Sequence, residues 1–234
     1  MTSILILTGV ELEARALARQ LELPDWRGLS FPVFGRGAVR LAAIGLGGAL
    51  CEARFDPLVD GLGAPLVISA GVCGALDPRL HAGDLVVPER VIAEGGGSHA
   101  LDAGPREALA GAGAAAWGGA LFSAGEIVGT PGAKAALFAR TGAVAVDMES
   151  GVVAARAARS GYQTLVVRAV SDDAGQCVPA ELARLVTPEG RLRVGGALTL
   201  GVRRPAVLAV AFELGQRTRR ALRVVARALA VMIG

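Results

Sequence analysis

Long hydrophobic runs are missing from this sequence, although 53% of its 234 residues are hydrophobic. No stretch approaches the roughly 18 consecutive apolar residues that a bilayer-spanning helix requires. The opening stretch SILILTGV is too short for such a helix, and it has neither a charged leading region nor a cleavage site. We therefore interpret it as the first core strand of a globular protein and expect a cytoplasmic location.

Disulfide and metal-binding patterns are missing as well. The three cysteines, Cys51, Cys73 and Cys177, form no CxxC pair, and the chain has two histidines, His81 and His99. This usage excludes a disulfide framework, argues against a zinc site and fits a reducing compartment. We expect neither a metal ion nor a cofactor.

The sequence has no GxxxxGK[ST] motif, which excludes a phosphate-cradling P-loop. GLGGAL (45–50) follows an expected strand and opens an expected helix, but it is not a complete GxGxxG fingerprint. We favour tight strand-to-helix packing over a dinucleotide site for this stretch. SAGVCGAL (69–76) places small residues after another expected strand, where the backbone can approach a ligand closely.

Short, continuously apolar runs alternate with helical patterns along most of the chain, which predicts an α/β fold with a mixed, mostly parallel central sheet flanked by helices. The expected strands are 3–8, 39–45, 65–70, 84–91, 119–124, 142–147 and 164–171. The expected helices are 11–22, 48–61, 105–113, 132–140 and 149–160. We predict a catalytic domain over 1–186 and a basic extension over 187–234.

The extension differs in charge from the rest of the chain. Between Arg184 and Gly234 the chain has ten arginines and two glutamates, and Lys134 is the sole lysine of the whole sequence. After a polar connection over 187–196, residues 206–232 have the pattern of an amphipathic helix. Its expected apolar face is Val207, Ala211, Leu214, Ala221, Val225 and Leu229, and its expected polar face is Glu213, Arg217, Arg220, Arg223 and Arg227.

Two interpretations of this helix stay open. It packs on the domain with a solvated basic face, or it lies on a membrane surface with its arginines toward anionic headgroups, which would place the protein peripherally on the inner face of the cell membrane. We do not expect nucleic-acid binding, because the arginines are interleaved with Val and Leu at helical spacing.

Acidic side chains follow several of the expected strands. Glu13 opens the first helix, Asp147 and Glu149 follow the strand in AVAVDMESG, and Ser171 and Asp172 end the strand in VVRAVSDDAG. Open parallel sheets bind ligands where the carboxyl ends of their strands meet, so we expect a pocket edged by these carboxylates. An acid for the leaving group, a base for water and a clamp for vicinal hydroxyls are what N-glycosidic cleavage needs. The alternative for isolated acids at helix starts is a capping role.

The motifs resemble those of the nucleoside phosphorylase/nucleosidase superfamily, especially its methylthioadenosine/S-adenosylhomocysteine nucleosidase branch. ILILTGVELEA, VISAGVCGALDPRLHAGDLVV, AVDMESGVVAARAARSGY and LVVRAVSDDAG follow the family's order over about residues 3–175. The pairs Met148–Glu149 and Ser171–Asp172, each after an expected strand, indicate this family only when they occur together. The resemblance implies a nucleoside phosphorylase-like single domain and a homo-oligomer.

Catalytic roles follow from the resemblance residue by residue. It implies that Asp172 protonates purine N7, that Ser171 orients Asp172, and that Glu13 positions the attacking water. Glu149 would bind the ribose 2′ and 3′ hydroxyls, with Met148 packed against the sugar.

Further substrate contacts are implied as well. Ile127 in SAGEIVG falls where the family holds the base, and the stretch Gly71, Val72, Cys73 and Gly74 would offer backbone groups to the substrate. Asp147 occupies a position that is acidic in many relatives, which implies a substrate contact. A turn or cap role is the open alternative.

Two departures from the family pattern bear on the nucleophile. Val72 stands where the hydrolases commonly have Ser, and the cationic phosphate site of the phosphorylases has only Arg15 as a candidate in the first loop. Because phosphate is costly to desolvate without cations, we favour water as the nucleophile.

The Arg-rich tail resembles the hopanoid-biosynthesis-associated branch of the superfamily. That resemblance implies a lipid-linked adenine nucleoside, adenosylhopane, cleaved to adenine and ribosylhopane. Methylthioadenosine/S-adenosylhomocysteine nucleosidase, futalosine hydrolase and purine nucleoside phosphorylase activities remain open, as does a nucleoside- or lipid-binding module without catalysis.

Overall fold

The computed structural model describes residues 3–179, 187 and 205–234, with the side chains of 205–211 left undescribed. Its strands are β1 (Ile4–Thr8), β2 (Asp25–Trp26), β3 (Val33–Arg36), β4 (Val39–Ala43), β5 (Leu66–Ala75), β6 (Leu85–Val86), β7 (Arg90–Ala93), β8 (Ser98–Ala100), β9 (Ala120–Ser123), β10 (Ala145–Asp147) and β11 (Thr164–Asp172). Its helices are α1 (Glu11–Gln20), α2 (Cys51–Val59), α3 (Ala103–Gly111), α4 (Pro131–Thr141), α5 (Ser150–Arg159) and α7 (Pro205–Ile233), with a 3-10 turn at Leu46–Gly48.

The strands form one mixed sheet, which confirms the predicted α/β class. Its order is β2-β3-β4-β1-β5-β10-β9-β7-β8, and β11 pairs with both β5 and β6. The inner pairings of β1 with β4, and of β5 with β1 and β11, are parallel, whereas β10 runs antiparallel to β5. β5 therefore pairs with three strands, β1, β10 and β11. Near the C-terminal end of β5, Gly74 lies opposite Val146 of β10 on one side and Asp172 of β11 on the other.

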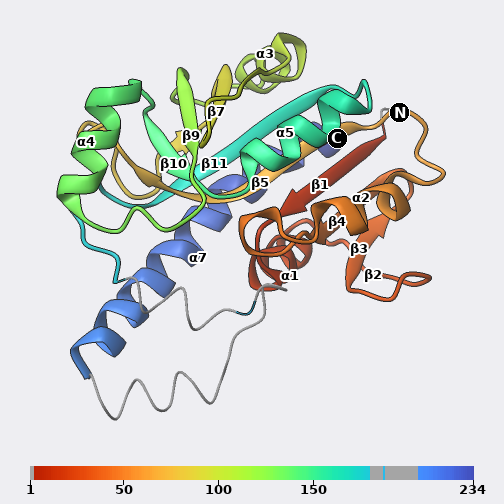
Figure 1. Ribbon diagram of the computed structural model, residues 1–234. Helices are drawn as coiled ribbons and strands as arrows, with labels where there is room; N and C mark the ends of the chain where they lie inside the picture. Colours follow the sequence, from red (N-terminus) through yellow and green to blue (C-terminus); the bar gives the residue numbers. More distant parts are fainter. Residues whose placement is uncertain (1–2, 180–186, 188–204) are drawn as a thin grey trace.

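Helices cover both faces of the sheet (Figure 1). On one face, α1 and α7 pack over β1, β5 and β11, with residues such as Leu17, Ile68 and Leu222 in one core cluster. On the other face, α2 and α5 contribute Phe55 and Val153 to a second cluster. Burial of both faces explains why the strands are continuously apolar rather than alternating.

The C-terminal helix α7 is part of the core. Ala221, Val225 and Leu229 are buried as the amphipathic pattern predicts, while Arg223 and Arg227 are exposed. The expected apolar positions Val207 and Ala211 lie outside the described side chains, and apart from Thr187 the expected polar connection over 187–196 lies outside the described residues. Within the part of the chain that the structure describes, no helix is long and apolar enough to cross a membrane.

Several element boundaries differ from the prediction. The expected strand 84–91 is divided into β6 and β7 around Pro88, which has no N–H for a ladder, and the two pieces pair with different strands. The expected helix 48–61 starts at Cys51, because Gly47 and Gly48 have left-handed backbone conformations (φ 61° and 72°).

The first half of the chain contains further differences. Gly71–Gly74, expected to follow a strand, form the second half of β5, which extends to Ala75. The short strands β2 and β3 were not predicted.

Candidate active site

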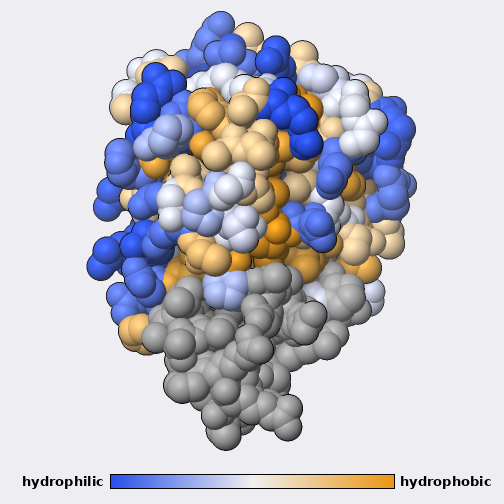
Figure 2. Space-filling view, turned by 60° about the vertical axis from the view of Figure 1, so that its left-hand side comes forward, coloured by the Kyte–Doolittle hydropathy of each residue, from blue (hydrophilic) through white to orange (hydrophobic). Residues whose placement is uncertain are grey.

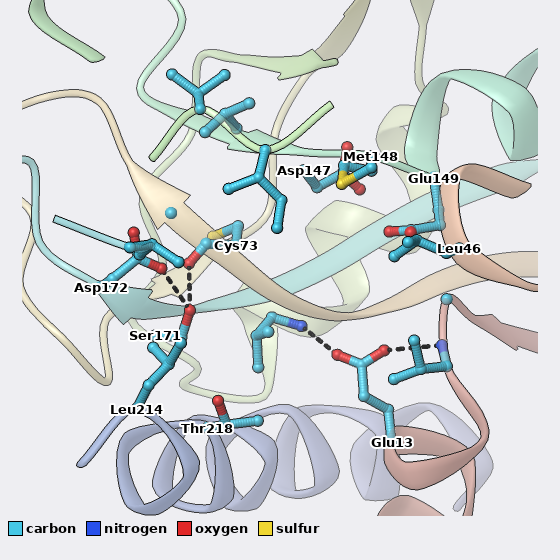
Figure 3. A pocket seen from close by; sticks show the side chains of 18 of the residues that line it. Glu13, Leu46, Cys73, Asp147, Met148, Glu149, Ser171, Asp172, Leu214 and Thr218 are labelled. Atoms are coloured by element: carbon cyan, nitrogen blue, oxygen red, sulfur yellow. Dashed lines mark hydrogen bonds between the residues drawn. The ribbon is translucent and has the colours of Figure 1, made fainter. Parts of the chain in front are cut away.

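A cavity of about 250 Å³ lies where the ends of β5, β10 and β11 meet the start of α1 and the middle of α7 (Figure 3). The site residues predicted from sequence line it, with one exception, together with apolar residues from α7 and from the turn before α2. The lining comprises Gly9, Val10, Glu13, Leu46, Val72, Cys73, Gly74, Glu126, Ile127, Val128, Val146, Asp147, Met148, Glu149, Ser171, Asp172, Val178, Leu214 and Thr218.

Asp172, the predicted proton donor, ends β11 at one end of the cavity. The Ser171 hydroxyl lies 2.7 Å from Asp172 Oδ1 and 3.2 Å from the Cys73 carbonyl oxygen, so it can donate to either oxygen. The register of β11 against β5 shifts between Val170 and Asp172, which gives both residues of the pair access to the same side of the sheet end. Ser171 thus contacts the carboxylate that it was predicted to orient.

Lys134 lies on the far side of that carboxylate. Its Nζ is 2.5 Å from Asp172 Oδ2, and the side chain is completely buried. Asp172 therefore has a hydrogen-bond donor on each carboxylate oxygen, a hydroxyl on one and an ammonium on the other.

Glu149 occupies the opposite end of the cavity, where it precedes α5. Its Oε1 accepts a hydrogen bond of 3.0 Å from the backbone N–H of Gly47. Burial raises the pKa of Glu149 to about 7; the Asp147 charge adds to the rise and Arg168 opposes it. A pair of vicinal hydroxyls can donate to the two oxygens of this carboxylate when it is ionised.

Glu13 faces the cavity from the first turn of α1. One carboxylate oxygen accepts a 3.1 Å bond from the Val72 backbone N–H, and the other lies 3.5 Å from the Val10 nitrogen (Figure 3). Burial raises the pKa of Glu13, and the charge of Arg168 and these backbone amides act in the opposite direction. A buried carboxyl with a raised pKa is suited to act as a base toward a bound water.

Arg168 lies behind the carboxylates and is almost completely buried. Its Nη2 forms an ion pair with Asp147 Oδ2 at 2.6 Å and donates to Ser69 Oγ at 2.7 Å and to Ser150 Oγ at 3.1 Å. Asp147 Oδ2 also accepts from the Ser150 backbone N–H at 3.0 Å. Asp147 therefore combines a helix-start hydrogen bond, the kind of contact that the turn or cap alternative predicts, with an ion pair to Arg168.

Two glycines allow the carboxylates to lie against β5. A Cβ at Gly74 would lie 2.9 Å from Asp172 Oδ2, and a Cβ at Gly71 would lie 3.0 Å from Glu13 Oε1 and closer still to Arg168 Nη1. Gly71 is the one predicted substrate contact that does not line the cavity. Met148, Ile127, Val72 and Cys73 do line it, and their contact with a substrate stays a prediction. Over the described residues, no group of His, Cys, Asp and Glu could hold a metal ion.

The sequence interpretation missed both buried cations. The sequence contained an indication of each. Lys134 is the only lysine of the chain, and Arg168 is the single charged residue inside the apolar run TLVVRAV. It also missed Leu214 and Thr218, through which α7 borders the cavity. Arg15, the candidate phosphate ligand, bonds instead to Glu11, with an Nη2–Oε1 distance of 2.6 Å, and does not line the cavity.

Comparison with known families and structures supports the same fold. The model of the phosphorylase superfamily matches residues 3–189. A mutant of the Helicobacter pylori methylthioadenosine nucleosidase with 5′-methylthioadenosine in its active site has a TM-score of 0.75 at 15% identity, and the match covers 100% of this chain and 98% of that one.

Two further solved structures are similar over nearly their whole length. The Neisseria meningitidis 5′-methylthioadenosine/S-adenosylhomocysteine nucleosidase with methylthio-immucillin-A matches at TM-score 0.75 and 18% identity, with coverage of 100% and 99%. The Helicobacter pylori futalosine hydrolase matches at 0.73 and 16%, with coverage of 99% and 97%. A search among curated proteins found no match.

Proposed function

The chain belongs to the phosphorylase superfamily, whose enzymes cleave the N-glycosidic bond of nucleosides, and we propose that it releases adenine from an adenine nucleoside with water as the nucleophile. The observation that carries the proposal is the placement of three buried carboxylates around one cavity. Asp172 lies at one end, and Glu149 and Glu13 lie toward the other (Figure 3).

Each carboxylate has one task in the proposed reaction. Asp172 gives a proton to purine N7 while the C1′–N9 bond breaks and its electron pair stays with adenine. Glu149 holds the ribose 2′ and 3′ hydroxyls, and Glu13 accepts a proton from the water that attacks the oxocarbenium-like carbon. Ser171 fixes Asp172 through the 2.7 Å contact, and Met148 and Ile127 pack against sugar and base.

Charge balance favours water over phosphate. Glu13, Asp147 and Glu149 surround a single guanidinium, Arg168, whose Nη2 already forms an ion pair with Asp147. A phosphate dianion beside Glu13 would meet more negative than positive charge in a buried site, which is unfavourable. A water molecule is neutral, so placing it beside Glu13 has no comparable electrostatic cost.

The substrate that we favour is adenosylhopane, which carries a long aliphatic group at the ribose 5′ position. Support comes from apolar side chains beside the proposed ribose site, where Leu46 adjoins the Gly47–Glu149 contact and Val10 adjoins Glu13. Helix α7 adds Leu214 to the cavity and an exposed Phe212 nearby in the chain. Figure 2 shows apolar residues gathered along the middle of one face between hydrophilic margins, a distribution compatible with a lipid-linked substrate.

The runner-up is methylthioadenosine/S-adenosylhomocysteine cleavage, since two of the similar structures hold methylthioadenosine or an analogue of it. Adenine release from adenosylhopane and from methylthioadenosine, each with and without phosphate, separates the two. We expect release from adenosylhopane that phosphate leaves unchanged. Rapid turnover of methylthioadenosine alone would remove the lipid assignment, and a strict phosphate requirement would overturn the choice of water.

Membrane contact through α7 is a separate part of this proposal. Because α7 belongs to the core, truncation before it would unfold the domain, so its surface is the part to change. The variant replaces the exposed Arg219, Arg220, Arg223 and Arg227 by Gln. We expect it to float less with liposomes containing anionic lipid than the wild type does. Equal flotation would show that these arginines do not bind membrane.

A further inference from the structure

Lys134 makes three hydrogen bonds, one for each proton of its ammonium group. Its Nζ lies 2.5 Å from Asp172 Oδ2, 2.8 Å from the Asp173 carbonyl oxygen and 3.2 Å from the Gln176 carbonyl oxygen. A lysine ammonium has three donors and no acceptor, so this arrangement satisfies the charged form completely. The side chain is buried, and a buried cation with a full set of acceptors is held in one place.

The helix that carries Lys134 fixes its direction. The Thr130 hydroxyl accepts a bond from the Ala133 backbone N–H, and Pro131 occupies the first turn, so α4 starts at a defined residue. The side chains that flank Lys134 in the sequence, Ala133 and Ala135, are exposed. Lys134 alone in this turn points toward the end of β11.

The pattern around Asp172 is that of an ionised carboxylate. Ser171 can donate to Oδ1 and Lys134 donates to Oδ2, which are the bonds that a carboxylate accepts after its proton has left. In the proposed reaction this is the state of Asp172 once N7 is protonated. An ammonium beside the developing negative charge stabilises that state more than the state before transfer.

We propose that Lys134 is a positioning residue for leaving-group protonation, holding Asp172 toward the base and stabilising the carboxylate that forms as the proton passes to N7. The inference rests on the proposed function. Before the step, Asp172 takes up a proton from solvent. In the step its O–H bond breaks, an N7–H bond forms, and the C1′–N9 electron pair moves onto adenine. The resulting Asp172 carboxylate is paired with the Lys134 ammonium. Lys134 itself neither gains nor loses a proton.

Leaving-group dependence tests this role. Lys134→Met, Lys134→Arg and Asp172→Asn are assayed on the adenine nucleoside that the wild type cleaves and on a 4-nitrophenyl riboside with the same 5′ group, whose nitrophenolate departs without protonation. Arg140→Met, which removes an exposed cation from the same helix, is the matched control. Thermal unfolding of each variant reports on folding.

For Lys134→Met we expect kcat on the nucleoside to fall about 100-fold, within the range of general-acid effects, and kcat on the nitrophenyl riboside to change less than about threefold. Lys134→Arg keeps a cation and should retain more nucleoside activity than Lys134→Met. Asp172→Asn should show the same substrate contrast, and Arg140→Met should match the wild type on both substrates.

Three results would overturn the inference. Equal losses on the two substrates would assign Lys134 a structural role, through its bonds to the Asp173 and Gln176 carbonyls. Unchanged activity on both would leave it without a role in the reaction. A wild type that cleaves no adenine nucleoside would refute the proposed function and the inference with it, whereas active wild type with an unaffected Lys134→Met refutes the inference alone.

Discussion

The carboxylate of Glu149 accepts a hydrogen bond of 3.0 Å from the backbone N–H of Gly47, across 102 positions of sequence. The contact joins the turn before α2 to the turn that starts α5, and both turns lie at the same edge of the sheet. The proposed ribose site is therefore built from two loops, one after β4 and one after β10, which the mixed sheet brings together. Glu149 is buried where these loops come together, and this burial raises its pKa.

Stability should fall as pH rises, because of Glu149. Burial raises its pKa from 4.5 to about 7, so between these values the folded protein binds a proton that the unfolded chain has released. The resulting stabilisation is present at the acidic end of this window and is lost as the pH passes the folded-state value. At 1.36 kcal/mol per pKa unit the loss approaches about 3 kcal/mol.

Denaturant unfolding of the ligand-free protein at pH 5 and pH 8 measures this effect. Glu149→Gln should flatten the dependence on pH, while Glu107→Gln, an exposed change on α3, should follow the wild type. The raised pKa of Glu13 acts in the same direction, so Glu149→Gln should leave part of the slope. An unchanged slope in Glu149→Gln would contradict the assignment.

Asp172→Asn should lower kcat for adenine release by about 10² to 10⁴-fold, because amide nitrogen cannot supply the N7 proton as a carboxyl group does. Substrate affinity should change much less, since the side chain keeps its shape. Steady-state kinetics with chromatographic detection of adenine measures both. Asp60→Asn, an exposed change at the end of α2, is the control. Retained kcat in Asp172→Asn would argue for a binding module or another proton donor.

Gly74→Ala should impair catalysis through Asp172. The new methyl carbon would lie 2.9 Å from Asp172 Oδ2, so the carboxylate must move away from its present position. Displacements of this order at a reacting group lower rates by about 100-fold. Gly132→Ala on α4, where a Cβ meets nothing within 4 Å, should leave kcat unchanged. Equal activity of the two variants would show that the contact does not constrain Asp172.

Arg168→Met should destabilise the fold by about 3 to 5 kcal/mol, because it leaves Asp147 as a buried, unpaired charge. Adding Asp147→Asn removes that charge and should recover part of the loss, which makes the double variant less destabilised than the sum of the single changes. Urea unfolding of the four proteins gives the coupling. Additive effects would mean that the ion pair contributes little.

The strands and helices of the central sheet could be predicted because their patterns are local. The expected strand 164–171 differs from Thr164–Asp172 by one residue, and the expected helix 149–160 differs from Ser150–Arg159 by one residue at each end. Predicted element boundaries were wrong where a single residue interrupts the backbone hydrogen bonding, as Pro88 does. They were also wrong where glycines with left-handed conformations turn the chain, as at Gly47 and Gly48. β2 and β3 were missed because short strands carry little periodic signal.

The sequence by itself determined the α/β class and the positions at which carboxylates follow apolar strands, since both depend on the order of neighbouring residues. Only the tertiary structure decided what surrounds each carboxylate. Lys134 reaches Asp172 across 38 positions, and Arg168 lies among Asp147, Glu149 and Glu13, which come from two other segments. Burial raises the pKa of Glu13 and Glu149, and burial depends on residues that meet in space rather than along the chain.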